Sequence, residues 1–310
     1  MDLRQLRALS AVAEHQSFSA AARALHTVQS NISTHIARIE RELDTVLIDR
    51  RTGQLTPEGE AVRLRAKRIE SELDAIEADV AGLQHDIHGA LRFGIIGTTA
   101  RWLVAPLLDA LDEAHPGIRL IVIDATTTSL IPQLRSGTLD AALVNLPVDD
   151  PEVTTEEVFE EERIVVTPTE HPLAQFDEIS LLDLTNYPLL LSPAGTQLRD
   201  TLDQAAQRVG STFSATAEVD GMRLMASLAF QGYSPAVLPA SAAPAGVTGD
   251  WKRVRVTGLD RRGVGIALPA STSPSATVRA FRATLIDVLI DQVQHHSGLS
   301  VSCQPEPTVD

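Results

Sequence analysis

Short polar side chains able to read the edges of DNA bases cluster near the N-terminus of the chain. They are amides and hydroxyls: Gln29, Ser30, Asn31, Ser33 and Thr34. Apolar residues recur here at helical spacing, which predicts a helix with one buried face made of Ile32, Ile36, Ile39 and Leu43. An α-helix fits the major groove and reads base edges from its N-terminal turns, where carboxylates would repel phosphates. The stretch therefore predicts a helix that reads DNA.

The neighbouring segments would position such a helix. Leucines between Leu3 and Leu9 predict a first helix, and the Ala-rich residues 20–25 predict a second. A turn at 26–28 then leads into the reading helix, which makes a helix-turn-helix. Residues 45–57 predict two short strands around a turn, a wing that carries Arg50 and Arg51. Arg38 completes the predicted DNA contacts. The alternative is that the polar residues only cap the helix and face solvent.

Two apolar series run through residues 58–88, each repeating every seven residues. Placed at positions a and d of a heptad, they predict a coiled-coil seam along one long helix. The predicted seam comprises Val62, Ala66, Ile69, Leu73, Ile76, Val80, Leu83 and Ile87. We interpret it as the contact between two chains of a dimer. The alternative is packing against the chain's own C-terminal domain.

Short β-branched or Leu-rich runs alternate with helical stretches over residues 90–296. This alternation predicts a mainly parallel sheet with helices on both faces, and the length suits two lobes. We expect lobe I to comprise about 90–162 and 266–296, and lobe II about 163–265. The polar residues 297–310 predict a disordered tail.

Threonines stand at or near three predicted strand-to-helix connections of this C-terminal domain. The residues are Thr98, Thr99, Thr127, Thr128 and the pair Gly195 and Thr196. In a doubly wound sheet such loops face the ligand crevice, where helix N-termini offer free N–H groups and partial positive charge. These residues therefore predict an effector site for a small anion such as an organic carboxylate. The alternative is that the threonines are simply helix N-caps.

Charge is unevenly distributed along the chain. Its net charge is −15, yet residues 1–70 hold 11 Arg or Lys against 9 Asp or Glu. A small DNA-binding module attached to a large acidic domain would show this asymmetry. No apolar run approaches the roughly 18 residues of a membrane span, and the N-terminus lacks the apolar core of a signal peptide. We therefore expect a cytoplasmic protein without a membrane partner.

Cysteine and histidine usage excludes some classes of site. Cys303 is the single cysteine, so an intrachain disulfide or thiol switch is not expected, and zinc-ligand spacings are missing. Motifs of serine hydrolases, P-loop enzymes and zinc proteases are missing as well. We expect no metal, no cofactor and no catalytic residue.

The first 65 residues resemble the winged helix-turn-helix of LysR-type transcriptional regulators. The matching features include Phe18, the Ala21-Ala22 pair, Gln29, Ser33 and the run "LTPEG" over 55–59. Segments such as "HPGIRL" and "GYSPAVLP" follow in the family's order. The resemblance implies a long linker helix, an effector domain of the type 2 periplasmic-binding-protein fold, and an oligomer that bends DNA. It also places the family's effector site at the threonine loops. The chain departs at Val28, where many members carry a serine able to cap the helix.

The combined prediction is an α/β protein with an N-terminal all-α winged helix-turn-helix (1–57), a linker and dimerisation helix (58–88) and a two-lobed effector domain (90–296). We expect a bacterial transcription regulator that binds an interrupted palindrome in double-stranded DNA as a homodimer or homotetramer, modulated by a small-molecule effector. One rival is a cytoplasmic small-molecule binding protein whose N-terminal helices only oligomerise it. The other is an enzyme on the two-lobed fold.

Overall fold

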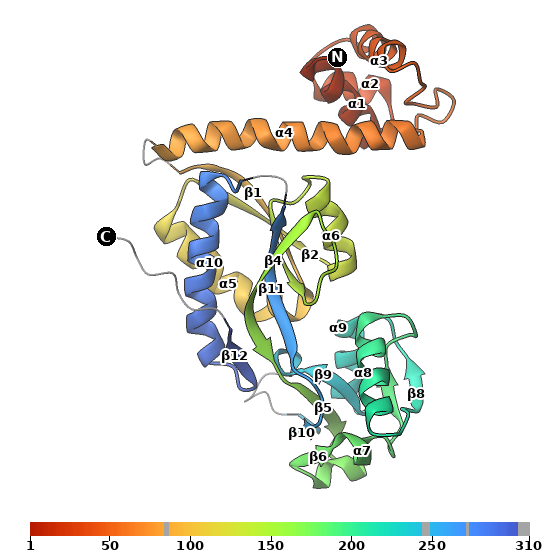
Figure 1. Ribbon diagram of the computed structural model, residues 1–310, viewed down its shortest axis with the longest axis vertical. Coiled ribbons are helices and arrows are strands. Elements are labelled where there is room, and N and C mark those ends of the chain that lie inside the picture. The colour runs from red at the N-terminus through yellow and green to blue at the C-terminus, as the bar shows by residue number, and fades with distance from the viewer. Residues whose placement is uncertain (84–86, 244–248, 271–272, 303–310) are drawn as a thin grey trace.

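The computed structural model describes residues 1–83, 87–243, 249–270 and 273–302. Figure 1 shows a small helical domain at the N-terminus, one long helix, and an α/β domain of two lobes. The long helix α4 lies across the upper end of the first lobe, and the N-terminal helices pack over its beginning. The predicted order of helical domain, linker helix and two-lobed α/β domain is confirmed. Within the described residues, no helix combines the length and apolar character needed to cross a membrane.

The N-terminal domain is built by α1 (Leu3–His15), α2 (Phe18–Ala24), α3 (Gln29–Glu42) and the start of α4 (Pro57–Leu83). Ile32, Ile36 and Ile39 of α3 are buried against α1 and α2, as their spacing predicted. Leu43 was predicted on the same face, but it is 40% exposed because α3 ends at Glu42. The predicted wing is reduced to one antiparallel bridge between Ile48 and Leu55.

The first lobe contains a mixed sheet in the order β12-β4-β11-β3-β1-β2. Its strands are β1 (Gly89–Ile95), β2 (Ile118–Asp124), β3 (Ala141–Asn145), β4 (Val153–Glu161), β11 (Arg262–Pro269) and β12 (Leu299–Val301). Its helices are α5 (Gly97–Ala114), α6 (Thr127–Arg135) and α10 (Ala276–Gln294). β1 is parallel to β2 and β3, whereas β11 and β12 pair antiparallel. The prediction of a mainly parallel sheet is therefore wrong for this lobe. The reason is that β11, by which the chain returns from the second lobe, pairs antiparallel with both β3 and β4.

The second lobe contains a sheet in the order β6-β10-β5-β9-β7-β8. Its strands are β5 (Arg163–Pro168), β6 (Glu178–Ser180), β7 (Leu189–Leu191), β8 (Ala215–Glu218), β9 (Ala236–Pro239) and β10 (Trp251–Thr257). Its helices are η1 (Pro172–Gln175), α7 (Leu181–Leu184), α8 (Gln197–Arg208), α9 (Met222–Phe230) and η2 (Ala240–Ala242). This sheet is also mixed, since β5 runs antiparallel to both β9 and β10.

The chain crosses from the first lobe to the second between β4 and β5, and returns between β10 and β11. Because β11 begins at Arg262, the predicted lobe limit at 265 and 266 falls inside a first-lobe strand. The predicted disordered tail is wrong for Leu299–Val301, which form β12 because Leu299 packs against the core and the strand pairs with β4. The rest of that predicted tail from Cys303 onward lies outside the described residues.

Candidate functional site

Helix α3 buries its isoleucines and turns its opposite face to solvent. Gln29, Ser30, Asn31, Thr34 and Arg38 are exposed on it, and Ser33 is half-buried. The N-cap residue Val28 makes no side-chain hydrogen bond, so the first N–H groups of the helix lack a side-chain cap. The predicted reading residues therefore share one accessible surface at the start of α3.

Two of these side chains already have partners within the chain. The Asn31 amide donates to Oγ1 of Thr27 at 2.9 Å, and the Thr34 hydroxyl donates to the Ser30 carbonyl at 2.8 Å. Within the part of the chain that the structure describes, the side chains of Gln29 and Arg38 contact no hydrogen-bond or ion-pair partner. Gln29 is therefore the amide most available to an incoming base edge.

Glu40 organises the wing, a role that our sequence reasoning missed. One carboxylate oxygen accepts from the N–H groups of Leu47 at 3.0 Å and Ile48 at 3.4 Å. The other accepts from the Arg50 guanidinium at 3.1 Å. Arg50 is thus engaged internally, whereas the Arg51 side chain has no such partner among the described residues. The available signal was weak, because Glu42 and Asp44 follow Glu40 closely and nothing in their spacing distinguishes the three carboxylates.

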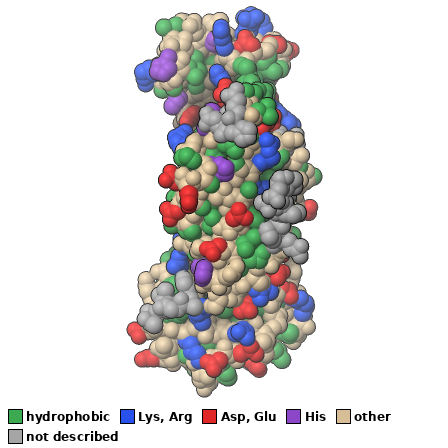
Figure 2. Space-filling model, turned by 90° about the vertical axis from the view of Figure 1, so that its left-hand side faces the viewer, with side chains coloured by type: hydrophobic (Ala, Val, Ile, Leu, Met, Phe, Trp, Pro, Cys, Tyr) green, Lys and Arg blue, Asp and Glu red, His purple; other side chains and the backbone are tan. Residues whose placement is uncertain are grey.

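The beginning of α4 must approach this wing closely. Gly59 makes the approach possible, because a Cβ at this position would lie 2.0 Å from the carbonyl oxygen of Leu47. Thr56 caps the helix by accepting from the Gly59 N–H at 3.0 Å, and its hydroxyl donates to the Val46 carbonyl. The wing is therefore fixed to both α3 and α4. On the face shown in Figure 2, basic and acidic side chains are mixed both over this N-terminal domain at the top and over the lobes below.

The predicted seam on α4 divides into two parts. Ala66 is fully buried in the N-terminal core, so it is not free to contact a second chain, and Val62 is half-buried beside it. Ile87 lies beyond the end of α4 and packs against the core of the first lobe. Leu73 is half-buried. The exposed members are Ile69 at 40%, Ile76 at 60%, Val80 at 55% and Leu83 at 82%.

A different face of α4 contacts the chain's own first lobe. That face presents Ser71, Ala75 and Ala78, and Asp79 accepts a hydrogen bond from the Ala276 N–H at 2.7 Å. Gly82 also lies close to Ala276. Packing within the chain therefore leaves the apolar stripe from Ile69 to Leu83 uncovered.

The first two threonine loops meet at the carboxyl edge of the first-lobe sheet. α5 follows β1 and α6 follows β2, and these strands pair in parallel. The N-cap residues Ile96 and Thr126 make no side-chain cap bond, so both helix N-termini lack this protection. Thr127 accepts instead from the Asn145 N–H at 3.0 Å, which ties α6 to the end of β3.

Burial differs among these threonines. Thr98 and Thr99 are buried, Thr127 is half-buried and Thr128 is exposed. Oγ1 of Thr99 and Oδ1 of Asn145 are buried without a hydrogen-bond partner. Buried polar atoms normally have partners, so two unpaired atoms at one edge are consistent with a polar ligand site.

In the third threonine loop, the threonine caps a helix, as the alternative interpretation of these threonines expected. Thr196 accepts from the Arg199 N–H at 3.4 Å and so caps α8, and its hydroxyl donates to the Pro193 carbonyl. Gly195 has a φ of +82°, a left-handed conformation that favours glycine. Within the described residues, no hydrogen bond joins this loop to those before α5 and α6.

A buried ion pair lies where the lobes join. Arg262 at the start of β11 pairs with Glu161 at the end of β4, and it donates to Oγ1 of Thr98 at 3.1 Å. Glu161 also accepts from the Ser241 N–H of η2 at 3.0 Å. Burial lowers the pKa of Arg262 to about 9, which leaves it protonated at neutral pH. The pair thus connects the first turn of α5 to the second lobe.

A second ion pair joins the lobes near the helix N-termini. Asp124 at the end of β2 forms an ion pair with Arg223 of α9 at 2.9 Å. The same carboxylate lies against Gly97, where a Cβ would be 2.9 Å from Oδ1. Arg101, further along α5, donates to the carbonyl of Ala242 at 3.2 Å. Sequence reasoning identified none of these interlobe contacts.

Across the described residues, no group of three or more His, Cys, Asp or Glu side chains is arranged to hold a metal ion.

Comparison with known proteins identifies the family. The family model described as LysR substrate binding domain matches residues 84–290, and that described as bacterial regulatory helix-turn-helix protein, lysR family, matches residues 3–60. A probable hydrogen peroxide-inducible genes activator of Mycobacterium leprae is 32% identical over 305 residues, 95% of this chain and 96% of the relative.

Solved structures share the fold over nearly the whole chain. A cysteine variant of full-length OxyR from Pseudomonas aeruginosa superposes with a TM-score of 0.76 and 25% identity, over 98% of this chain and 99% of that one. Full-length CbnR in complex with its target DNA superposes with a TM-score of 0.67 and 22% identity, over 93% and 100% of the two chains, a likeness of fold alone. The family match over 3–60 displaces the rival in which the N-terminal helices only oligomerise the protein. The chain belongs to the LysR family of bacterial helix-turn-helix regulators and is a DNA-binding transcription regulator.

Proposed function

We propose that this regulator binds an interrupted palindrome as a dimer or tetramer and that a small anion held between its lobes modulates it. The observation that carries the DNA-binding part is the exposed polar face at the start of α3, opposite the buried isoleucines. Helices of this kind enter the major groove with their N-terminal residues against base edges. Gln29, Ser30, Asn31, Ser33 and Thr34 would read bases, and Arg38, Arg50 and Arg51 would contact phosphates.

The contacts within the chain rank these residues. Gln29 can place both an acceptor and a donor against one base, the pairing that suits adenine. Asn31 and Thr34 would have to release Thr27 and the Ser30 carbonyl first. Arg51 is better placed than Arg50 to neutralise a phosphate, because Glu40 already pairs with Arg50.

Dimerisation is supported by the uncovered stripe on α4. Four large apolar side chains, those of Ile69, Ile76, Val80 and Leu83, lie exposed at heptad spacing on a helix whose opposite face is already docked. A row of exposed apolar residues at heptad spacing is typical of a surface on which another helix packs, unlike single apolar residues scattered over a surface. A second copy of the chain would cover the stripe, and its two-fold axis would match a palindrome.

The effector part of the proposal rests on the paired N-termini of α5 and α6. Two helix N-termini without side-chain caps present free N–H groups and partial positive charge at one edge. A carboxylate of the chain itself, that of Asp124, already lies against the first turn of α5. An anionic effector would take that position and compete for Arg223, so ligand binding and lobe contact would be linked.

Peroxide response is a second candidate, favoured by the relatives named as peroxide-inducible activators. A thiol that senses peroxide must be present as a reactive thiolate. Cys303 is the single cysteine of this chain and lies outside the described residues. Substitution Cys303→Ser separates the two ideas: a response to peroxide that the variant loses would favour thiol chemistry, whereas an unchanged response to organic anions would favour the noncovalent effector.

Sequencing of DNA fragments that co-purify with the full-length chain tests the regulator proposal directly. Enrichment of one interrupted palindrome is expected, followed by its confirmation in a gel-shift titration. Recovery of fragments without a common motif would count against specific recognition.

The effector part is tested by thermal shift against carboxylates, neutral metabolites and amines. A carboxylate should raise the melting temperature of the parent, and the double variant Thr99→Val with Thr128→Val should respond less. If only neutral or cationic compounds raise the melting temperature of the parent, the proposal of an anionic effector is wrong. If the double variant responds as the parent does, the site lies elsewhere.

A further inference from the structure

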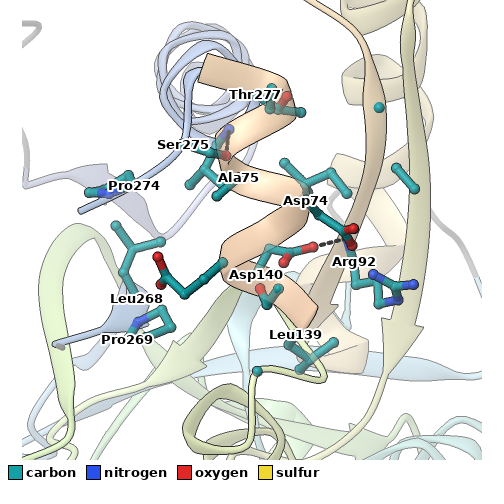
Figure 3. Close-up of a pocket in the computed structure, with 18 of the residues that line it drawn as sticks. Asp74, Ala75, Arg92, Leu139, Asp140, Leu268, Pro269, Pro274, Ser275 and Thr277 are labelled. Atoms are coloured by element: carbon teal, nitrogen blue, oxygen red, sulfur yellow. Dashed lines mark hydrogen bonds between the residues drawn. The ribbon is translucent and has the colours of Figure 1, made fainter. Parts of the chain in front are cut away.

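A cavity of about 310 Å³ lies between α4 and the first lobe (Figure 3). Its walls come from α4, the start of β1, the loop before β3, the end of β11 and the start of α10. It lies at Gly89 and Ala90, the opposite end of β1 from the Thr98 loop, so it is separate from the effector position proposed above. The volume falls at the lower end of small-molecule pockets, which span roughly 300–1,000 Å³.

Polar contacts hold α4 above this space at two places along the helix. Arg68 donates to the carbonyl of Arg135 and pairs with Glu152. About three helical turns later, Asp79 accepts from the Ala276 N–H at 2.7 Å and pairs with Arg279 at 3.4 Å. Between these contacts the short side chains of Ser71, Ala75 and Ala78 leave space under the helix, and the acidic residues Glu72, Asp74 and Glu77 line it as well.

The deep part of the cavity is apolar. Leu91, Leu134, Leu139 and Val278 belong to the buried core of the first lobe and also line the cavity. Leu268 and Pro269 form the wall at the end of β11 (Figure 3). An occupant with an apolar body would therefore bury that body against existing core side chains.

Carboxylates supply the charge of the site. Asp140, from the loop before β3, accepts from the Arg92 N–H at 2.7 Å through one oxygen. Asp74 approaches the same point from α4, as the close-up shows (Figure 3). Burial raises the pKa of Asp140, and the Asp74 carboxylate acts in the same direction. Glu72 and Glu77 add further negative charge along the helix.

Among the described residues, the basic residues nearby form no ion pair with Asp74 or Asp140. Arg68 and Arg135 pair with Glu152, and Lys67 pairs with Glu70 at 3.5 Å. Arg92 lies on the cavity wall, but within the described residues its guanidinium forms no ion pair. Within the described residues, the Asp74 and Asp140 carboxylates thus form no ion pair, although the charges of Arg92 and Lys67 act to lower the pKa of Asp140. A ligand cation between the two carboxylates would offset their mutual repulsion.

We propose that this cavity binds a small organic cation, an ammonium or guanidinium group carried on an apolar body. The charged group would lie between Asp74 and Asp140, and the apolar body against Leu91, Leu139 and Val278. Because such a ligand would contact α4 and the first lobe together, it would fix the helix that carries the DNA-binding domain. Binding there would be a second input to the regulator, independent of the anion between the lobes.

Isothermal titration calorimetry on the full-length chain tests the proposal with benzylamine as the probe. Benzyl alcohol has the same ring without charge, and benzoate has the opposite charge. Saturable binding of benzylamine is expected, with both other compounds at least about tenfold weaker, as loss of one charge-assisted contact would give. Absence of benzylamine binding, or equal binding of benzyl alcohol, would overturn the proposal.

Two variants from opposite walls locate the site. Asp140→Asn keeps an acceptor for the Arg92 N–H but removes the charge, and Ala78→Leu fills the space from α4. Each should weaken benzylamine binding about tenfold or more. Asp287→Asn, the same change at an exposed position of α10, is the matched control and should bind as the parent does. Parent-like affinity of Asp140→Asn would overturn the proposal even if Ala78→Leu failed to fold.

Discussion

Arg262 and Glu161 are direct neighbours in the register of β11 and β4, where the chain crosses between the lobes. Glu161 is fully buried and the Arg262 side chain is 11% exposed. Two charges removed from water are tolerated only when they satisfy each other, and each here has a further partner, Thr98 for the arginine and Ser241 for the glutamate. The pair therefore fixes the geometry of the crossing.

Removal of one charge from this pair should destabilise the protein strongly. Glu161→Gln leaves the buried guanidinium unpaired, a change that costs about 3–5 kcal/mol in comparable cases. The free energy of unfolding from urea titration is the measurement. The double variant Glu161→Met with Arg262→Met removes both charges and should recover most of that loss. A Glu161→Gln variant as stable as the parent would show that water reaches the pair.

Elements that depend on periodicity within one segment could be predicted from the sequence. Features that depend on contacts between distant segments could not. Ile32, Ile36 and Ile39 identified the buried face of α3 because their spacing is that of one helix. β4 escaped detection because its residues 155–157 are polar and exposed between the buried Val153, Val158 and Phe159. The predicted seam contained Ala66 because heptad spacing alone does not tell which helix covers a residue.

The same distinction holds for the sites. The loops at Thr98 and Thr127 were placed correctly at one sheet edge because loops after parallel strands share that edge. Asp124 and Arg262 act through partners far along the chain, and no spacing within one segment reveals such partners. Glu40 acts through the nearby Leu47, Ile48 and Arg50, but only the turn into the wing brings them to its carboxylate. Thr196 turned out to be an N-cap, since a threonine before a helix has the same sequence signature in either role.

Gln29 is expected to read a base directly. Gln29→Ala should weaken binding to the specific palindrome by about 1–3 kcal/mol and have much less effect on random DNA, where phosphate contacts dominate. Fluorescence anisotropy with both DNAs at one salt concentration measures the difference. Gln207→Ala removes an exposed amide in the second lobe and serves as the control. Equal losses on both DNAs would show that Gln29 does not discriminate bases.

The two wing arginines should differ because only Arg50 has an internal partner. Arg51→Ala should weaken binding to every DNA sequence and lower the slope of log K against log salt by about one. Arg50→Ala should change that slope less and reduce thermal stability more, since Glu40 then loses its cation. The idea fails if the two variants exchange these effects.

The apolar stripe on α4 should hold two chains together. Ile76 is 60% exposed in the single chain, so Ile76→Asp should leave the fold intact while placing a charge in each half of the interface. Sedimentation velocity should show a shift from dimer or tetramer to monomer. Ala61→Asp adds the same charge at an exposed position of α4 outside the stripe and should not dissociate the oligomer. A parent-like sedimentation profile for Ile76→Asp would remove the stripe from the interface.

Asp140 should give the stability of the protein a characteristic pH dependence. Burial raises the pKa of its carboxyl above the ordinary value of 3.8, and the charge of Asp74 adds to the rise. The hydrogen bond from the Arg92 N–H and the charges of Arg92 and Lys67 act against it. Between 3.8 and the raised value, the folded state binds more protons than the unfolded state. The contribution of Asp140 to the free energy of unfolding therefore falls as pH rises through that window.

Asp140→Asn removes this titration while keeping an acceptor for the Arg92 N–H. The stability of the variant relative to the parent should therefore increase as pH rises from about 4 to about 7. Urea titrations at several pH values measure this difference, and Asp287→Asn, at an exposed position, should show no comparable rise. A relative stability of Asp140→Asn that is flat or falls across the same range would mean that the carboxylate is solvated in the folded protein.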